Sequence, residues 1–214
     1  MKRFFSVTSL VLAASLSTLA QEYPKAEVFG GYSFLHSDDN PSFRAPGANL
    51  HGWNASVTAN LNLWFGLTAD FSGHYDSSSS SAVITTPGFP GFPVPSPLPT
   101  FTTSVRSDTN IHTFMAGPRF SYRKRERITP FAHLLFGVTR RHVETKISSS
   151  LFGRTSFSNN ESGFAGAVGG GLDVSLGGKL ALRVIQADYQ LTHVFGSNSN
   201  NARISTGIVF RFDQ

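Results

Sequence analysis

Arginine, aspartate and glutamate are the residues whose types and positions most clearly indicate chemistry in this sequence. They recur on the polar side of runs in which apolar and polar residues alternate, and lysine is scarce there. Arginine binds a carboxylate through two parallel hydrogen bonds, so this mixture favours a packed ionic network over unconnected surface charges. We predict that the network lies inside the fold and contains Glu27, Asp70, Arg119, Arg183, Asp188, Arg203 and Arg211.

Histidine and serine offer a second kind of chemistry. A serine hydroxyl beside a histidine base is an activated nucleophile, which lipid-modifying hydrolases and acyltransferases use. No motif joins a serine to any of the seven histidines, and no metal-ligand spacing stands out; the histidines are His36, His51, His74, His112, His133, His142 and His193. We therefore predict no catalytic, cofactor-binding or metal-binding residue, and keep a lipid-modifying enzyme as an alternative.

Eight alternating runs must position these residues. A period of two residues is that of a β-strand with two different faces. Each run is close to the ten residues that cross a bilayer as a tilted strand, and none shows helical periodicity. The runs are 26–35, 51–61, 65–75, 110–122, 129–140, 162–175, 179–193 and 202–212. This pattern predicts an all-β chain.

The connections between the runs alternate in length. Those at 62–64, 123–128 and 176–178 are short, whereas those at 36–50, 76–109, 141–161 and 194–201 are longer. Antiparallel strands joined in this way place every short turn at one end, as transmembrane barrels do. We therefore predict an eight-stranded antiparallel up-and-down transmembrane β-barrel. Residues 76–109 combine a serine run with six prolines, and we expect them to form an outer loop without regular sheet.

The distribution of aromatic and polar residues indicates which face of each run points toward lipid. Aromatic residues such as Trp53, Tyr75 and Tyr122 lie on the apolar face near the run ends, as at the membrane boundaries of a barrel. In the last run, the same reasoning predicts one face toward lipid (Ile204, Thr206, Ile208, Phe210 and Phe212) and one toward the lumen (Arg203, Ser205, Gly207, Val209 and Arg211). We expect this strand to close the sheet against residues 26–35.

Two local features need a special backbone. In the run 179–193 the alternation of polar and apolar residues changes phase. A β-bulge near residues 184–185 would turn both Arg183 and Asp188 inward. Three consecutive glycines at 169–171 would permit tight curvature and leave room for large neighbours across the lumen.

The N-terminal segment is typical of export. Residues 1–20 combine a basic start with a short apolar run and small residues before Gln21, so we predict a signal peptide, followed by a barrel domain at 21–214. An uncleaved anchor is the alternative. The chain has no cysteine, so no disulfide holds the fold. The net charge of +5 is scattered, and we expect no nucleic-acid partner.

Several segments, taken in order, resemble the small eight-stranded outer-membrane barrels of the OmpA/OmpX type, described as outer membrane protein beta-barrel domains. These segments are 28–34, 130–140, 167–174 and 183–193. The C-terminal segment is similar to the assembly signal of such barrels at Ser205, Gly207, Phe210 and Phe212, although Asp213 and Gln214 follow it. The resemblance implies the outer membrane of a Gram-negative-type cell, contact with its lipid, and recognition by the barrel-assembly machinery.

An eight-stranded barrel has an interior just wide enough for side chains to fill. We therefore expect a non-enzymatic outer-membrane protein whose recognition of any surface ligand lies in its outer loops. The alternatives are the lipid-modifying enzyme and a soluble lipocalin-like barrel, which would have an apolar cavity and a polar outside.

Overall fold

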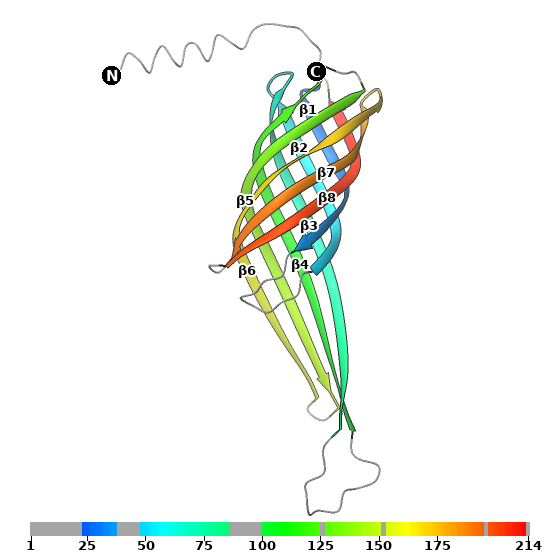
Figure 1. Cartoon of the computed structure of the whole chain (residues 1–214), viewed down its shortest axis with the longest axis vertical. Coiled ribbons are helices and arrows are strands. Elements are labelled where there is room, and N and C mark those ends of the chain that lie inside the picture. The colour runs from blue at the N-terminus through cyan, green and yellow to red at the C-terminus, as the bar shows by residue number, and fades with distance from the viewer. Residues whose placement is uncertain are drawn as a thin grey trace, which may run out of the picture.

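The computed structural model describes residues 23–37, 48–85, 100–124, 127–150, 153–194 and 197–212, which form a single closed barrel (Figure 1). Each strand pairs antiparallel with the next, and β8 pairs with β1, so the predicted eight-stranded up-and-down topology is confirmed. The strands are β1 (Ala26–Ser37), β2 (Ala48–Asn60), β3 (Phe65–Thr85), β4 (Thr100–Ser121), β5 (Ile128–Ser149), β6 (Gly153–Gly177), β7 (Leu180–Val194) and β8 (Ser197–Phe212). The predicted signal peptide and the tail at 213–214 lie outside the described residues.

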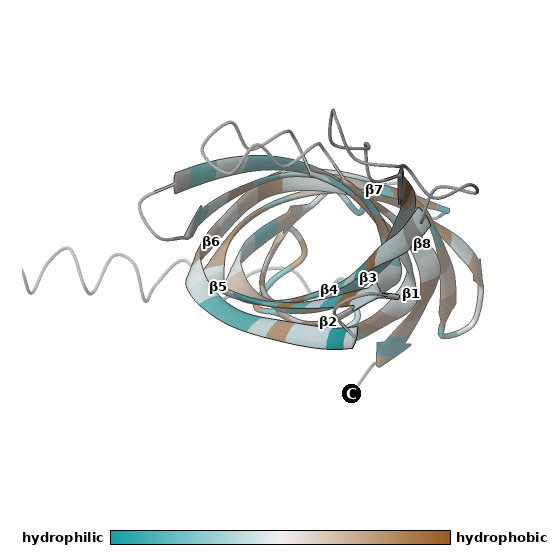
Figure 2. Cartoon of the chain, turned by 90° about the horizontal axis from the view of Figure 1, so that it is seen from below, coloured by the Kyte–Doolittle hydropathy of each residue, from teal (hydrophilic) through white to brown (hydrophobic). Residues whose placement is uncertain are grey.

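The barrel is polar inside and apolar outside. Seen end-on, the strands form one ring around the lumen (Figure 2). On β8, Arg203 and Val209 are fully buried inside, whereas Phe210 is 51% exposed outside. A soluble lipocalin-like barrel would have the opposite arrangement, so the structure contradicts that alternative. No helix in the described ranges is long and apolar enough to cross a membrane.

The irregular strand β7 contains the predicted bulge. Arg183 pairs with Gly207 and Gln186 with Ser205, so β7 uses one residue more than β8 over this interval. Both Val184 and Ile185 consequently point outward, at 47% and 46% exposure. Arg183 and Asp188 both point inward and are buried, which confirms the prediction.

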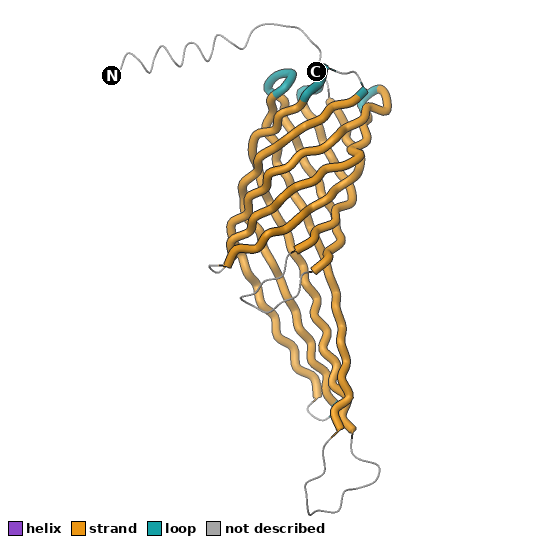
Figure 3. Tube along the Cα trace, in the orientation of Figure 1, coloured by secondary structure: helices purple, strands orange, loops and turns teal. Residues whose placement is uncertain are grey.

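Four strands continue well beyond the others on one side of the barrel (Figures 1 and 3). β3 to β6 have 21 to 25 residues, whereas β1, β2, β7 and β8 have 12 to 16. We call the extension the projecting sheet and define it as residues 76–85, 100–109, 140–149 and 153–163. The short turns, including 61–64 and 178–179, lie at the opposite end, which we call the short-turn end (Figure 3).

The projecting sheet corrects two expectations from the sequence. The predicted connection 141–161 is mostly paired strand, from Arg141 with Glu161 to Ser149 with Gly153. Residues 76–109 are not a loop throughout, because the β3–β4 ladder continues from Asp76 paired with Thr109 to Thr85 paired with Thr100. All six prolines fall within 86–99, outside the described residues. The serine run contains no proline, so every residue retains its backbone donor for the ladder.

Closure of the barrel depends on a close approach between β1 and β8. Gly31 and Gly207 are direct partners across this seam. A Cβ atom on Gly31 would lie 2.0 Å from the carbonyl oxygen of Thr206, whereas one on Gly30 would have no heavy atom within 4 Å. The seam therefore needs glycine at position 31 and not at position 30.

We expect Gly31→Ala to lower the free energy of unfolding by about 1–3 kcal/mol, because the added methyl group forces the backbones apart. The measurement is the fraction of protein that migrates as the folded, heat-modifiable band, together with denaturant unfolding in micelles. Gly30→Ala is the matched control and should fold as the original chain does. Equal behaviour of the two variants would show that the seam tolerates the methyl group.

Candidate functional site

The lumen is filled by inward-pointing polar and charged side chains from all eight strands. The structure brings all seven sequence-predicted network residues into two linked groups. The Glu27 cluster lies toward the short-turn end and consists of Glu27, Arg119, Arg123, Asp173, Arg183 and Arg211. The Asp188 cluster lies next to it and consists of Asp70, His133, Gln186, Asp188 and Arg203.

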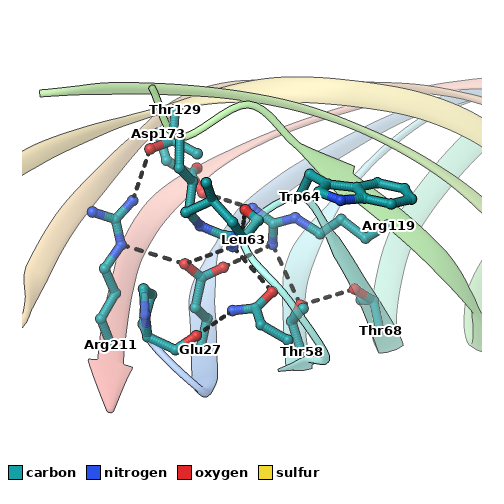
Figure 4. A network of polar contacts seen from close by, with 12 residues as sticks. Glu27, Thr58, Leu63, Trp64, Thr68, Arg119, Thr129, Asp173 and Arg211 are labelled. Carbon is teal, nitrogen blue, oxygen red and sulfur yellow. Dashed lines mark hydrogen bonds and ion pairs between the residues drawn. The ribbon is translucent and has the colours of Figure 1, made fainter. Parts of the chain in front are cut away.

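The Glu27 cluster is centred on one shared carboxylate (Figure 4). Glu27 Oε1 lies 3.3 Å from Arg123 Nη2 and 3.4 Å from Arg211 Nε, and its Oε2 lies 3.5 Å from Arg119 Nη1. Arg119 also donates to Asp173 at 2.9 Å, and Asp173 accepts from Arg183 Nε at 2.8 Å. One continuous ionic chain therefore connects β1, β4, β6, β7 and β8.

The Asp188 cluster is more tightly paired. Arg203 donates to Asp188 at 2.6 Å and to Asp70 at 2.7 Å, and His133 Nε2 lies 2.7 Å from the other oxygen of Asp188. Gln186 joins the two clusters, since it accepts from Arg183 at 2.7 Å and donates to Asp188 at 2.8 Å. The network thus extends along the barrel from the Glu27 cluster to the Asp188 cluster as well as across it.

Aromatic rings complete the filling of the lumen. The guanidinium carbon of Arg119 lies 3.9 Å from the centroid of the Phe131 ring, and that of Arg183 lies 4.2 Å from the Phe29 centroid. Such contacts stabilise a cation by about 2 kcal/mol when water is excluded. The triple glycine supplies the remaining room: a Cβ on Gly169 would lie 2.0 Å from Asp188 Oδ1. The glycine thus makes room for a large side chain, but for one on the adjacent strand β7 and not, as expected, for one across the lumen.

Sequence reasoning missed four members of the network. Asp173 and His133 lie on the polar, inward-pointing face of their runs. The alternation of faces along each run could therefore have predicted that both side chains point into the lumen. The predicted bulge turns Gln186 inward, but because this residue is uncharged it was not counted in the network. Arg123 belongs to a basic turn that reads as solvated, yet its side chain folds back and donates to the Leu63 carbonyl oxygen at 2.8 Å.

The predicted assembly-signal residues all lie on β8. Ser205 points inward and donates to Ser33 Oγ at 3.0 Å, whereas Phe210 and Phe212 point outward, at 51% and 49% exposure. Gly207 lies where the β8 backbone packs closely against Gly31 of β1. Their proposed role in assembly stays a prediction.

The histidines have varied surroundings. His74 accepts or donates a hydrogen bond with Ser33 at 2.9 Å, but both side chains are buried in the lumen, away from any lipid substrate. On the outer surface, His112 contacts the Tyr75 hydroxyl at 3.3 Å and His142 contacts Asn160. Within the described ranges, no three His, Asp or Glu side chains gather into a group that could hold a metal ion.

The outward face of the projecting sheet carries a row of basic residues. Arg106 on β4 is the direct cross-strand partner of Lys146 on β5, and Arg154 on β6 is the partner of Ser148, two residues along. A surface pocket of about 360 Å³ is lined by Lys146, Ser148, Arg154 and Ser156, together with Ile147 and Thr155. Asp108 and Glu144 pair with Arg106 and Lys146, but Arg154 makes no ion pair with the described residues.

Arg203 provides the clearest test of the network. We expect Arg203→Met to lower the free energy of unfolding by about 3–5 kcal/mol, because it leaves two buried carboxylates without their cation. Denaturant unfolding in micelles measures this change. Arg106→Met is the control, since that exposed pair contributes less than about 1 kcal/mol. Adding Asp70→Asn to Arg203→Met should recover part of the loss; equal effects of Arg203→Met and Arg106→Met would contradict the network's role.

Comparison with known proteins places this fold in a family. The structure is similar to that of Ail, the attachment invasion locus protein of Yersinia pestis, with 17% identity and a TM-score of 0.54 over 87% of this chain and 99% of Ail. A complex of Ail with the heparin analogue sucrose octasulfate gives 18% identity and a TM-score of 0.53 over 86% and 97%.

Neisserial surface protein A is similar at 11% identity and a TM-score of 0.51, over 88% of this chain and 97% of its own. These likenesses concern the fold alone. A search of curated proteins found no match. The family model of the outer membrane protein beta-barrel domain matches residues 6–212, nearly the whole sequence. The chain therefore belongs to the outer membrane protein beta-barrel domain family.

Proposed function

We propose that this outer-membrane protein is a non-enzymatic surface-recognition protein, whose barrel anchors the projecting sheet outside the membrane. The observation that carries the proposal is the contrast between the two parts of the molecule. The lumen is closed by buried ion pairs, whereas four strands continue beyond the barrel and carry mainly polar residues that are exposed or half-buried. A filled lumen favours anchoring over transport, and the long strands favour contact with something outside the cell.

The projecting sheet has two features that suit recognition. In the described part of the chain, residues 76–85 of β3 and 153–163 of β6 each have a strand partner on one side only. Such edges leave backbone donors and acceptors free for a partner. The basic row adds charge: Asp108 and Glu144 partly neutralise Arg106 and Lys146, whereas Arg154 makes no ion pair with the described residues.

An anionic glycan is the ligand class that this surface fits. Sulfate and carboxylate groups of such a chain would pair with the guanidinium and ammonium groups of the basic row, which is spread over three neighbouring strands. The sucrose octasulfate complex of Ail supports the choice of probe, although the shared identity is low and the likeness is one of fold.

Residues 1–20 would direct export and be removed, and residues 21–214 would form the mature barrel. The barrel-assembly machinery would recognise Ser205, Gly207, Phe210 and Phe212, and the outward apolar side chains would contact outer-membrane lipid. No nucleic acid, cofactor or metal has a part in this scheme.

The test is titration of the purified barrel in zwitterionic micelles with sucrose octasulfate. We expect saturable binding, which Lys146→Met combined with Arg154→Met weakens about tenfold or more, because two charge-assisted contacts are lost. Arg127→Met is the control, since Arg127 is an exposed cation at the short-turn end. Binding that survives the double substitution would refute the basic row as the recognition surface.

Conductance in a planar bilayer tests the closed lumen. We expect no stable, large channel, because the Glu27 and Asp188 clusters fill the cross-section of the barrel. A large and persistently open conductance from the folded protein would overturn the anchoring role and favour transport.

A further inference from the structure

The Glu27 cluster holds more positive than negative charge. Its members include four guanidinium groups and two carboxylates, all from side chains no more than 14% exposed. The neighbouring Asp188 cluster has two carboxylates, one arginine and His133, and so offsets part of the excess. The described lumen network still contains five arginines and four carboxylates.

The excess is concentrated on two arginines at the short-turn end. Arg119 shares Glu27 but has Asp173 as a second carboxylate partner, and Arg183 also pairs with Asp173. Arg123 and Arg211 have Glu27 as their carboxylate partner within the described residues, at 3.3 and 3.4 Å from the same oxygen. One carboxylate cannot neutralise three guanidinium groups, and a buried charge without a counter-ion costs several kcal/mol.

Unused hydrogen-bond donors lie in the same place. The buried Nε atoms of Arg119, Arg123 and Arg211 have no hydrogen-bond acceptor, even though Arg211 Nε is close to Glu27. Buried donors are nearly always paired, so each unpaired one calls for an explanation. The side chains of Arg119 and Arg123 are 2% and 7% exposed, so solvent has little access to them, whereas Arg211, at 14%, is nearer the opening.

The surroundings of the opening would concentrate anions. Lys25, Lys124, Arg127 and Lys179 are exposed around the short-turn end. The described residues of the three short turns and of 23–25 include no aspartate or glutamate. The described part of this surface therefore carries mainly positive charge, and such a surface beside a low-dielectric lumen raises the local concentration of anions.

We propose that the short-turn end of the lumen binds a small tetrahedral oxyanion, of the phosphate or sulfate class, between Arg123 and Arg211. The planar guanidinium group matches the spacing of two oxyanion oxygens, and a tetrahedral anion offers enough oxygens for two arginines at once. The anion would offset the excess charge of Arg123 and Arg211, approaching from the side of Arg211, the more exposed of the two. This end lies opposite the projecting sheet, so the site is independent of surface recognition.

The experiment is titration of the purified full-length protein in zwitterionic micelles with sodium phosphate, against sodium chloride at matched ionic strength. Thermal unfolding and titration calorimetry are the two readouts. We expect a saturable rise of the unfolding temperature with phosphate beyond that with chloride, since a ligand of the folded state stabilises it. Arg211→Met should weaken phosphate binding about tenfold or more, because a charge-assisted contact is lost.

Two further variants test whether phosphate binding depends on the Glu27 cluster itself. Arg127→Met removes a cation from the same end but not from the Glu27 cluster, and should leave phosphate binding unchanged. Glu27→Gln removes the competing carboxylate and should strengthen it. If Arg211→Met folds poorly, Arg211→Lys is the substitute, because it retains the charge but lacks the planar guanidinium group. The calorimetric isotherm of the unaltered protein remains the deciding measurement.

Three outcomes would overturn the proposal. The first is an unaltered protein that responds equally to phosphate and chloride. The second is a loss of binding in Arg127→Met as large as that in Arg211→Met, which would indicate general electrostatic attraction. The third is a response that appears only after removal of Asp213 and Gln214, which would mean that the chain's own carboxylates, and not a solution anion, occupy the site.

Discussion

Lipid offers no hydrogen bonds, and this single constraint determines the form of the molecule. Every backbone N–H and C=O group at membrane depth must find its partner within the protein, so a sheet can cross only if it closes on itself. The β1–β8 ladder achieves this closure with twelve partner pairs, from Ala26 with Phe212 to Ser37 with Asn201. Closure then forces one face of every strand outward to lipid and the other inward to a narrow lumen.

The charged lumen is a consequence of that division. Once the outward face is apolar, the inward face can carry charge only if each group finds a partner, because the interior is too narrow for bulk water. Arg203 shows the solution, since its planar group contacts two carboxylates from different strands. A shift of register by one residue would turn these side chains to lipid, so the network also fixes how the strands align.

The sequence predicted those parts of the structure that the membrane governs. Strand number, order and facing follow from an apolar face that must meet lipid, and even the bulge at Val184 follows from the need to turn Asp188 inward. The network predicted from charge was nearly complete in its arginines, but Arg123 lies in a turn, where no alternation indicates the direction of a side chain. His133 and Gln186 were missed because charge was the only criterion.

The same reasoning explains why the projecting sheet was misread as a loop. Beyond the membrane neither face of a strand meets lipid, so the alternation that marks a membrane strand disappears and a serine run can continue the ladder. Closure is no longer necessary either, because water satisfies the free edges of β3 and β6. The barrel is therefore closed where lipid surrounds it, whereas the projecting sheet is open and has free backbone edges on β3 and β6.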